Sequence, residues 1–556
     1  MTKSFRFLIW ASLAAVPFFT GISSVRAQTP ASAALTGKIS SAEEGSMEGV
    51  LVSAKRAGST VTITVVSDQQ GRYSFPRTKL EPGRYSLRIR AVGYEMDDPG
   101  PAEIAAQKTT QLDLKLHKTP DLSMQISNGE WMMSWPGTDE QKRAFLNCAG
   151  CHTLERIVRS RYTAAQWPQI FQRMSTYAPG TTAVRPQVRP HREVGEANSE
   201  RMQRQAEYAS SINLSAVSKW EYPLKTLPRP KGRATRVIVT EYDLPRPEAM
   251  PHDGVMDSDG MVWYSDFGWQ YLGKLNPKTA QVVEYPVPEL KQGFPTGLLD
   301  VEFDHEGNIW LGMMLQAGIA KFDKKTQKFQ TWPLPKEINN DAGQQAMVMP
   351  RQRHVDGKVW MNSVGRRGLH RVDLKTGEFE TFEPYKNLPR ESGPHSAYGI
   401  AADSQNNIYF MDFASQNVGK IDAKTGKITL FPTPTPNSTP RRGHMDSQDR
   451  FWFTEFQANQ VAMFDTRTEK FQEWALPTAW TGPYDVIWDK NGELWTSGMS
   501  NDLVVRMNIK TGESTEYLLP RNTNVRRVDV DNSTTPVTFW VGNNHGGSIT
   551  KVEPLD

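Results

Sequence analysis

The sequence Cys148-Ala149-Gly150-Cys151-His152 is the part of the chain best suited to chemistry. Two thiols separated by two residues can each form a thioether with one vinyl group of the same porphyrin, and the histidine behind them can ligate the iron from its proximal side. The chain has 2 cysteines in 556 residues, and both lie in this motif. The motif therefore predicts one covalent haem c, held by Cys148 and Cys151, with His152 as the proximal iron ligand.

Two other interpretations explain less of the motif. A thiol redox pair would use both cysteines but would leave His152 without a role. A structural zinc site would need a second pair of ligands nearby, and the sequence offers none.

The ligand on the distal side of the iron decides what the haem can do. A thioether closes the iron and suits electron transfer, whereas an open position suits small-ligand chemistry. Met174 is the predicted distal ligand, because Trp167 to Met174 resembles the W-x-x-x-x-x-R-M helix of short cytochromes paired with periplasmic oxidoreductases. Met202 and His191 are the alternatives, and Met174 as an ordinary core residue of its helix is the remaining interpretation.

The N-terminus has the pattern of a secretory signal. Lys3 and Arg6 precede an apolar stretch, 7–19, that is short for a membrane span, and Val25-Arg26-Ala27 offers a cleavage site. Residues 1–27 are therefore predicted to be a signal peptide, with an uncleaved anchor as the alternative. Export to the periplasm agrees with a c-type haem, which matures outside the bacterial cytoplasm, and no later stretch could span a membrane.

Composition describes an ordinary globular protein, with 38% hydrophobic and 23% charged residues. Cleavage of the signal removes Lys3, Arg6 and Arg26, which lowers the formal net charge from +4 to +1. A chain so close to neutral gives no electrostatic case for binding nucleic acid or acidic lipid.

Short strands with turn residues between them predict a small β-sandwich over residues 35–117. The segment resembles the carboxypeptidase regulatory-like domain, and the likeness rests on three sequences: Gly71-Arg72-Tyr73-Ser74-Phe75, Leu80-Glu81-Pro82-Gly83-Arg84-Tyr85 and Ala91-Val92-Gly93-Tyr94. The resemblance implies a non-catalytic spacer or docking module.

Between residues 121 and 230 the periodicity becomes helical. Helices are predicted from Asp139 into the C-x-x-C-H motif, from Ala164 to Tyr177 and from Glu200 to Ile212. Three helices around a haem resemble a minimal cytochrome c, and a haem domain of that kind is predicted for residues 121–230.

Residues 234–556 repeat with a period of about 45 residues, each unit containing an Asp-x-x-Gly type turn before an aromatic strand. Seven such units predict a seven-bladed β-propeller, closed by a strand at 236–241, with six or eight blades as the alternatives. The blades resemble the virginiamycin B lyase (streptogramin lyase) family, through Phe451-Trp452-Phe453-Thr454-Glu455 and Val283-Glu284-Tyr285-Pro286-Val287-Pro288.

The resemblance to the lyases does not extend to their catalytic residues. Those enzymes use a histidine base and Mg²⁺; His444 matches their substrate-contacting histidine, but Tyr484 stands where the base is expected. The metal-binding glutamates fall on Gly482 and Met499. Without a base and carboxylates, lyase activity is not expected.

Polar residues nevertheless gather where the inner strands should begin, at positions that line a propeller's central channel. These candidates are His252, His354, His395, His444 and Arg527. Several histidines with arginines beside them indicate a site for an anionic or metal-bound ligand, and a solvated channel that binds nothing is the alternative.

The sequence thus predicts a mainly β, multidomain chain: a β-sandwich, a three-helix cytochrome c-like domain and a seven-bladed propeller. The predicted function is that of a periplasmic c-type cytochrome in electron transfer, the haem-bearing component of an oxidoreductase, with a redox partner protein or a small-molecule electron donor. The alternatives are a propeller lyase or hydrolase with an accessory haem, and a non-catalytic binding or sensory protein. Whether the chain is an enzyme is left open.

Overall fold

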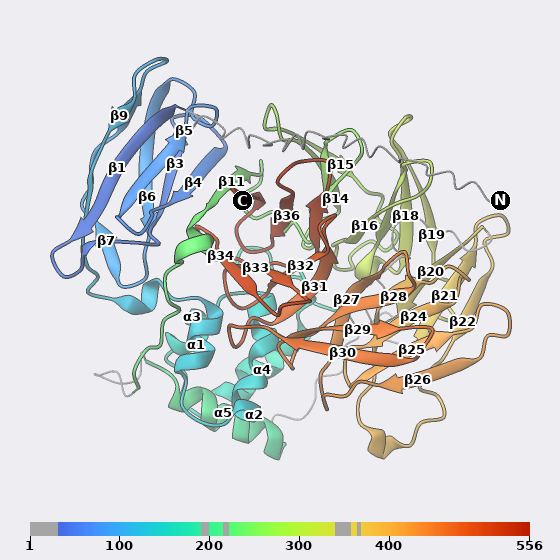
Figure 1. Ribbon diagram of the computed structural model, residues 1–556. Helices are drawn as coiled ribbons and strands as arrows, with labels where there is room; N and C mark the ends of the chain where they lie inside the picture. The colour runs from blue at the N-terminus through green and yellow to red at the C-terminus, as the bar shows by residue number, and fades with distance from the viewer. Residues whose placement is uncertain (1–31, 191–198, 215–221, 340–356, 364–367) are drawn as a thin grey trace, which may run out of the picture.

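The computed structural model describes residues 32–190, 199–214, 222–339, 357–363 and 368–556. In Figure 1 a blue β-sandwich lies at the upper left, a group of short helices lies at the lower left, and a large array of sheets fills the rest. The predicted signal peptide, His191 and His354 lie outside the described residues.

The sandwich consists of two sheets that enclose an apolar core. Its strands are β1 (Ala33–Ser41), β2 (Gly45–Ser46), β3 (Leu51–Arg56), β4 (Val61–Val66), β5 (Arg72–Pro76), β6 (Gly83–Arg90), β7 (Tyr94–Met96), β8 (Ala102–Ile104), β9 (Thr110–Gln111) and β10 (Leu114–Lys118). One sheet has the order β2-β1-β10-β7, with β5 and β9 also paired to β1, and the other contains β4-β3-β6-β8. Alternation along β5 places Tyr73 and Phe75 inside, where both are buried.

Six further sheets follow in chain order. Their strands are β12 (Val255–Met256), β13 (Val262–Ser265), β14 (Tyr271–Asn276), β15 (Gln281–Pro286); β16 (Leu299–Phe303), β17 (Ile309–Gly312), β18 (Gly318–Asp323), β19 (Lys328–Pro333); β20 (Lys358–Ser363), β21 (Gly368–Asp373), β22 (Phe379–Phe382); β23 (Ala397–Ala402), β24 (Ile408–Asp412), β25 (Asn417–Ile421), β26 (Ile428–Pro432); β27 (Pro440–Met445), β28 (Arg450–Glu455), β29 (Gln460–Asp465), β30 (Lys470–Ala475); β31 (Pro483–Trp488), β32 (Glu493–Gly498), β33 (Leu503–Asn508) and β34 (Ser514–Leu518). First strands of neighbouring sheets contact one another, such as β23 with β27 and β27 with β31, so these strands lie innermost in a β-propeller.

The seventh sheet closes the ring and joins it to the sandwich. It contains β35 (Val528–Asp531), β36 (Thr538–Asn543), β37 (Ser548–Pro554) and β11 (Val237–Asp243). One edge of β11 pairs with β37 from the C-terminus, and its other edge pairs with β4 of the sandwich, antiparallel in both cases. The result is one 8-stranded sheet that runs through both domains.

Each Asp-x-x-Gly type turn fixes the aromatic strand that follows it. In the first blade, Oδ1 of Asp257 accepts hydrogen bonds from the backbone N–H groups of Asp259 and Met261, at 2.9 and 3.0 Å. Its Oδ2 accepts the indole N–H of Trp263 at 2.7 Å. The same indole bond recurs at Trp310, Trp452 and Trp495. The repeated carboxylate therefore closes the turn and also satisfies the polar edge of a buried tryptophan.

The predicted three-helix cytochrome c-like domain is wrong. The segment contains short elements: η1 (Leu122–Met124), α1 (Asn128–Ser134), α2 (Asp139–Arg143), η2 (Leu146–Gly150), α3 (Glu155–Val158), α4 (Trp167–Thr176) and α5 (Glu200–Ser211). Elsewhere the described residues contain η3 (Gly232–Thr235), η4 (Met314–Gln316) and η6 (Arg390–Ser392). The helix that starts at Asp139 ends at Arg143, and a 3₁₀ turn carries the first cysteine.

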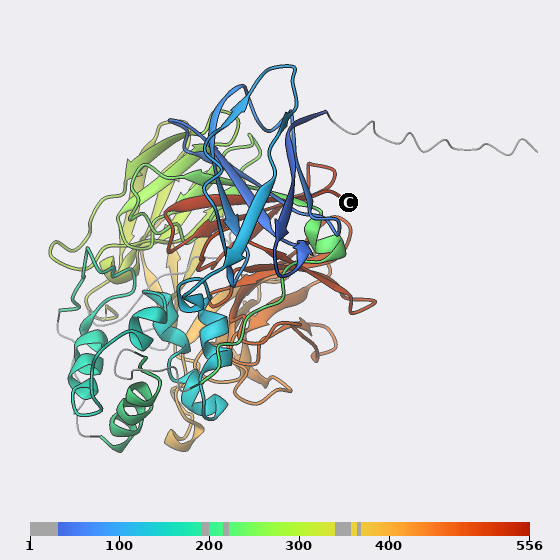
Figure 2. The same ribbon diagram turned by 90° about the vertical axis from the view of Figure 1, so that its left-hand side faces the viewer.

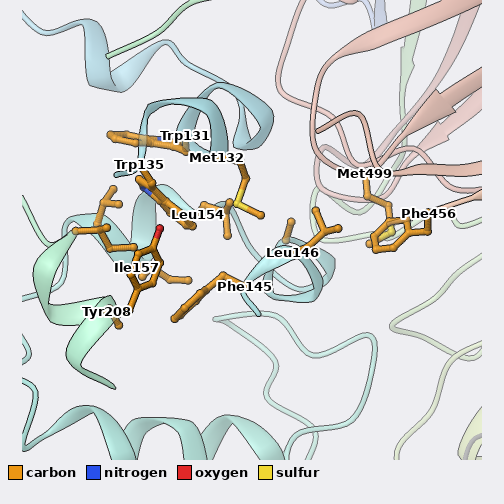
Figure 3. Packing of buried hydrophobic residues seen from close by; sticks show 14 of the residues in the cluster. Trp131, Met132, Trp135, Phe145, Leu146, Leu154, Ile157, Tyr208, Phe456 and Met499 are labelled. Carbon is orange, nitrogen blue, oxygen red and sulfur yellow. The ribbon is translucent and has the colours of Figure 1, made fainter. Parts of the chain in front are cut away.

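The physical reason is that the helices are short, and that the apolar core of this segment, in which Trp135 packs on Phe145 and Tyr208, continues into the propeller. Its buried tryptophans Trp131 and Trp135 belong to the same apolar cluster as Phe456 and Met499 of the propeller (Figure 3). We call residues 121–190 and 199–214 the helical segment. Its apolar side chains pack partly on one another and partly on the propeller, and in the second view its helices lie below the yellow-green sheets (Figure 2). Within the described part of the chain, no helix is long and apolar enough to cross a membrane.

Candidate functional site

The helical segment covers one end of the propeller, where loops lead into the inner strands. The backbone N–H of Gly129 at the start of α1 donates to the carbonyl of Ser500. A Cβ on Gly129 would lie 3.2 Å from Cβ of Asn501, so glycine permits this close approach. We call the covered end the propeller mouth and define it by Tyr398, Arg441, Tyr484, Asn524 and Arg526.

The C-x-x-C-H motif is fixed directly to the propeller mouth. The side-chain amide of Asn524 donates to the carbonyls of Ala149, at 3.0 Å, and Met499, at 3.1 Å. The guanidinium of Arg526 donates through Nη2 to the carbonyl of Gly150 at 2.8 Å, and it stacks on Phe267 with its carbon 4.0 Å from the ring centroid. Asn524 and Arg526 are both buried. Two side chains of the propeller therefore hold the peptide between the two cysteines.

Both cysteines are free thiols, and burial raises their pKa, that of Cys148 to about 12. A reactive redox pair needs a stabilised thiolate, so this environment does not favour that interpretation. Nδ1 of His152 lies 2.8 Å from the carbonyl of Thr153, and burial lowers the pKa of its imidazole. A neutral imidazole whose Nδ1 is bound to a backbone carbonyl keeps Nε2 for a metal, as iron-ligating histidines do. The donor set of two thiols and one oriented imidazole fits a covalent haem.

His545 is a further histidine at the motif that the sequence analysis missed. Its Nε2 is buried and has no hydrogen-bond partner among the described residues. Burial lowers its pKa to about 3, assisted by the positive charge of Arg526, while a hydrogen bond to the backbone of Gly150 acts in the opposite direction. The sequence His545-Gly546-Gly547 falls between β36 and β37, a position that no motif in the sequence singled out.

Met174 lies on α4 and is 39% exposed. Met202 lies on α5 and is half-buried. The choice of Met174 as distal ligand stays a prediction.

The predicted channel residue His252 lies beside Tyr484 in the propeller. Nε2 of His252 is 3.0 Å from the hydroxyl of Tyr484, and its Nδ1 is 2.5 Å from Oδ1 of Asp253. Burial lowers the pKa of His252 to about 3, so the ring is neutral. The Tyr484 hydroxyl also bonds to that of Tyr398. The tyrosine that replaces the expected base of the lyases therefore belongs to a buried hydrogen-bonded chain.

Arg527 lies in a buried ion-pair network below the propeller mouth. It pairs with Glu302, and its Nη1 is 3.5 Å from Oδ2 of Asp253. The neighbouring Arg442 donates to Asp300 at 2.7 Å. Burial raises the pKa of Asp300 well above its ordinary value. The carboxylates of this network neutralise the charge of Arg527, so Arg527 is poorly suited to bind an anionic ligand.

The other predicted histidines are separate from one another. Nε2 of His444 lies 3.2 Å from the carboxylate of Asp485, close to the ion-pair network. His395 bonds through Nδ1 to Asp412 at 2.6 Å, lies 2.9 Å from the Ser392 hydroxyl, and stacks on Tyr385, all within one blade and its entry loop. The structure therefore joins His252, His444 and Arg527 around the channel and gives His395 a local role.

Arg441 is one of the arginines that lie close in sequence to the predicted channel histidine His444, and the structure gives it a larger part in the site. Its guanidinium carbon lies 4.2 Å from the ring centroid of Phe456, 4.3 Å from that of Tyr484 and 4.6 Å from that of Phe413. Arg441 is 7% exposed, and its Nε and Nη1 have no hydrogen-bond partner in the part of the chain that the structure describes. Among the described residues, no group of three or more His, Cys, Asp or Glu side chains could hold a metal ion.

Sheets of this kind around a closed ring define a β-propeller protein, and comparison with known proteins agrees. Residues 292–555 match the model of the virginiamycin B lyase family, and residues 34–117 match that of the carboxypeptidase regulatory-like domain. Both resemblances seen in the sequence are thereby confirmed for these residues. No curated protein matches the chain in sequence.

Solved structures with a similar arrangement include a streptogramin B lyase, at 20% identity and a TM-score of 0.49, covering 58% of this chain and 100% of that one. Virginiamycin B lyase from Staphylococcus aureus follows at 20% identity and 0.48, covering 57% and 99%. The extracellular domain of a putative one-component system from B. thetaiotaomicron has 15% identity and 0.42, covering 55% and 40%.

Proposed function

We propose that this chain is an exported binding protein that uses the propeller mouth as its binding surface and carries one haem c there. Cys148 and Cys151 would hold the haem through thioethers, and His152 would be the proximal ligand. The observation that supports this best is that the propeller holds the C-x-x-C-H motif in place: Asn524 and Arg526 donate hydrogen bonds to the carbonyls of Ala149 and Gly150. A prosthetic group attached here would lie between the helical segment and the propeller.

The residues of the chain would each contribute to such a site. The carbonyl of Thr153 orients the His152 ring, Asn524 and Arg526 fix the peptide between the thiols, and the apolar cluster of the helical segment excludes water. A bound haem would supply reversible one-electron chemistry. The predicted signal peptide at 1–27 would deliver the chain to the periplasm, where c-type haem is attached.

The test is expression of the full chain in a host that attaches c-type haem in its periplasm. Haem staining of the denatured chain and the mass of the intact chain should both show one covalent haem. The double variant Cys148→Ala/Cys151→Ala should lose the stain, while His117→Ala, which alters an exposed histidine, should keep it. A wild-type chain that leaves this host without covalent haem would rule out the proposed cofactor.

Electron transfer to a redox partner protein or from a small-molecule donor is the second candidate, favoured by the C-x-x-C-H motif itself. It requires a closed iron, with Met174 as the proposed distal ligand. Replacement of Met174 by alanine should then abolish the charge-transfer band of a methionine-ligated ferric haem and lower its reduction potential. An unchanged spectrum would exclude Met174, and a haem that does not cycle reversibly between oxidation states would exclude the electron-transfer role.

A further inference from the structure

Two pairs of adjacent arginines reach the centre of the propeller, and the members of each pair have opposite surroundings. Arg442 and Arg527, the second of each pair, are neutralised by Asp253, Asp300 and Glu302. Within the described part of the chain, Arg441 and Arg526 have no carboxylate at ion-pair distance, although both are buried. The propeller mouth therefore carries two buried positive charges that no carboxylate of the described residues balances.

Aromatic rings cover the faces of Arg441 but leave its edge without acceptors. Phe413, Phe456 and Tyr484 all lie within 4.6 Å of the guanidinium carbon, measured to the ring centroids. Such cation–π contacts stabilise a guanidinium through its face. The N–H groups point outward in the plane, and those at Nε and Nη1 have no partner. Since a buried charged donor without an acceptor is costly, a missing acceptor is indicated at this edge.

Arg526 adds to the positive potential at the same place. It lies over Phe267 and also faces Tyr484, 5.9 Å from that ring's centroid, so both arginines share Tyr484. Burial lowers the pKa of Arg526, and the charge of Arg441 lowers it further. Two guanidinium groups that repel each other in a buried site gain most from an anion that reaches both.

We propose that Arg441, assisted by Arg526, forms an anion site at the propeller mouth that takes a carboxylate. A carboxylate matches the planar fork of a guanidinium edge with two parallel hydrogen bonds. Two sources share this chemistry: a propionate of the proposed haem and a free organic acid. The inference rests on the proposed role of the mouth as a binding surface, but it does not require that a haem is attached.

The test is calorimetric titration of the full chain with succinate, in a haem-free form (Cys148→Ala/Cys151→Ala) and in a haem-loaded form. Succinamide, a neutral analogue, and sodium chloride at the same ionic strength are the ligand controls. Arg441→Gln should weaken succinate binding by about tenfold or more, since it removes hydrogen bonds to a charged group. Arg441→Lys should restore part of it, and Arg467→Gln, at an exposed arginine, should have no effect.

The two forms distinguish the sources of the carboxylate. Binding of succinate to the haem-free chain alone, with a shift of the haem reduction potential in Arg441→Gln, assigns the site to a propionate. Binding to both forms assigns it to a free organic acid. If Arg441→Gln is poorly folded, a melting temperature of the wild type that rises with succinate but not with succinamide supports the site. The proposal is overturned if no form binds succinate and Arg441→Gln leaves the haem potential unchanged, or if Arg441→Gln binds as the wild type does. Absence of haem from a chain that still binds succinate would refute only the proposed cofactor.

Discussion

Replacement of Asn524 by alanine should release the C-x-x-C-H motif from the propeller. Asn524 is fully buried and makes three hydrogen bonds: its amide donates to the carbonyls of Ala149 and Met499, and its Oδ1 accepts from Nε of Arg526 at 3.0 Å. Only the bond to Ala149 joins the propeller to the motif, and a typical buried hydrogen bond contributes about 1 kcal/mol, so the local free energy of opening should fall by about that amount. A difference of that size raises the population of the open state about fivefold.

The assay is the rate at which Cys148 and Cys151 react with a thiol reagent in the haem-free chain with both cysteines intact, under conditions where closing is faster than labelling. Both cysteines are only partly exposed, so an increase in the labelling rate reports opening of the motif. Asn491→Ala, at an exposed turn asparagine, is the control and should label at the wild-type rate. A change of less than threefold in Asn524→Ala would refute the idea that these bonds hold the motif in place.

Two other predictions concern the propeller itself. Burial raises the pKa of Glu455 to about 7, so the folded chain holds this proton more tightly than the unfolded chain, and stability should fall as the pH rises towards 7. Glu455→Gln keeps the neutral form and should flatten the fall in melting temperature between about pH 4.5 and 7; superimposable profiles would contradict the assignment. Val239→Pro interrupts β11, which is paired on both sides, and should cost more than about 3 kcal/mol by chemical denaturation. Val283→Pro, on the outer strand β15 with one paired neighbour, should cost clearly less, and equal losses would contradict the argument.

The propeller could be predicted from the sequence because the interactions that define its repeat join residues close together in the chain. In four of the blades the aspartate of the Asp-x-x-Gly type turn binds its own backbone and the indole six residues later, as Asp446 does with Trp452 and Asp489 with Trp495. These interactions lie within one hairpin, so their spacing survives in the sequence. The sandwich was predictable for the same reason, through its alternating strands.

The arrangement of the helical segment could not be predicted in this way. Periodicity identifies an apolar face on a helix, but it does not tell what covers that face. Trp131 and Trp135 fit a small helical domain, and the sequence alone does not tell that the apolar cluster to which they belong continues to Phe456 and Met499 of the propeller. The sequence also could not show that Arg442 is neutralised and Arg441 is not, because the carboxylates that neutralise Arg442 lie more than a hundred residues earlier in the chain.

The shared strand β11 determines how the whole chain responds to force and to partial unfolding. One edge of β11 pairs with the propeller and the other with the sandwich, so the two domains are not joined by a linker alone. The sandwich cannot rotate relative to the propeller without breaking the backbone hydrogen bonds of this sheet. A pull applied to the N-terminal end would load that ladder in shear before it reached the blades. The sandwich thus stabilises the blade that closes the propeller, and we expect both domains to unfold in one step rather than one after the other.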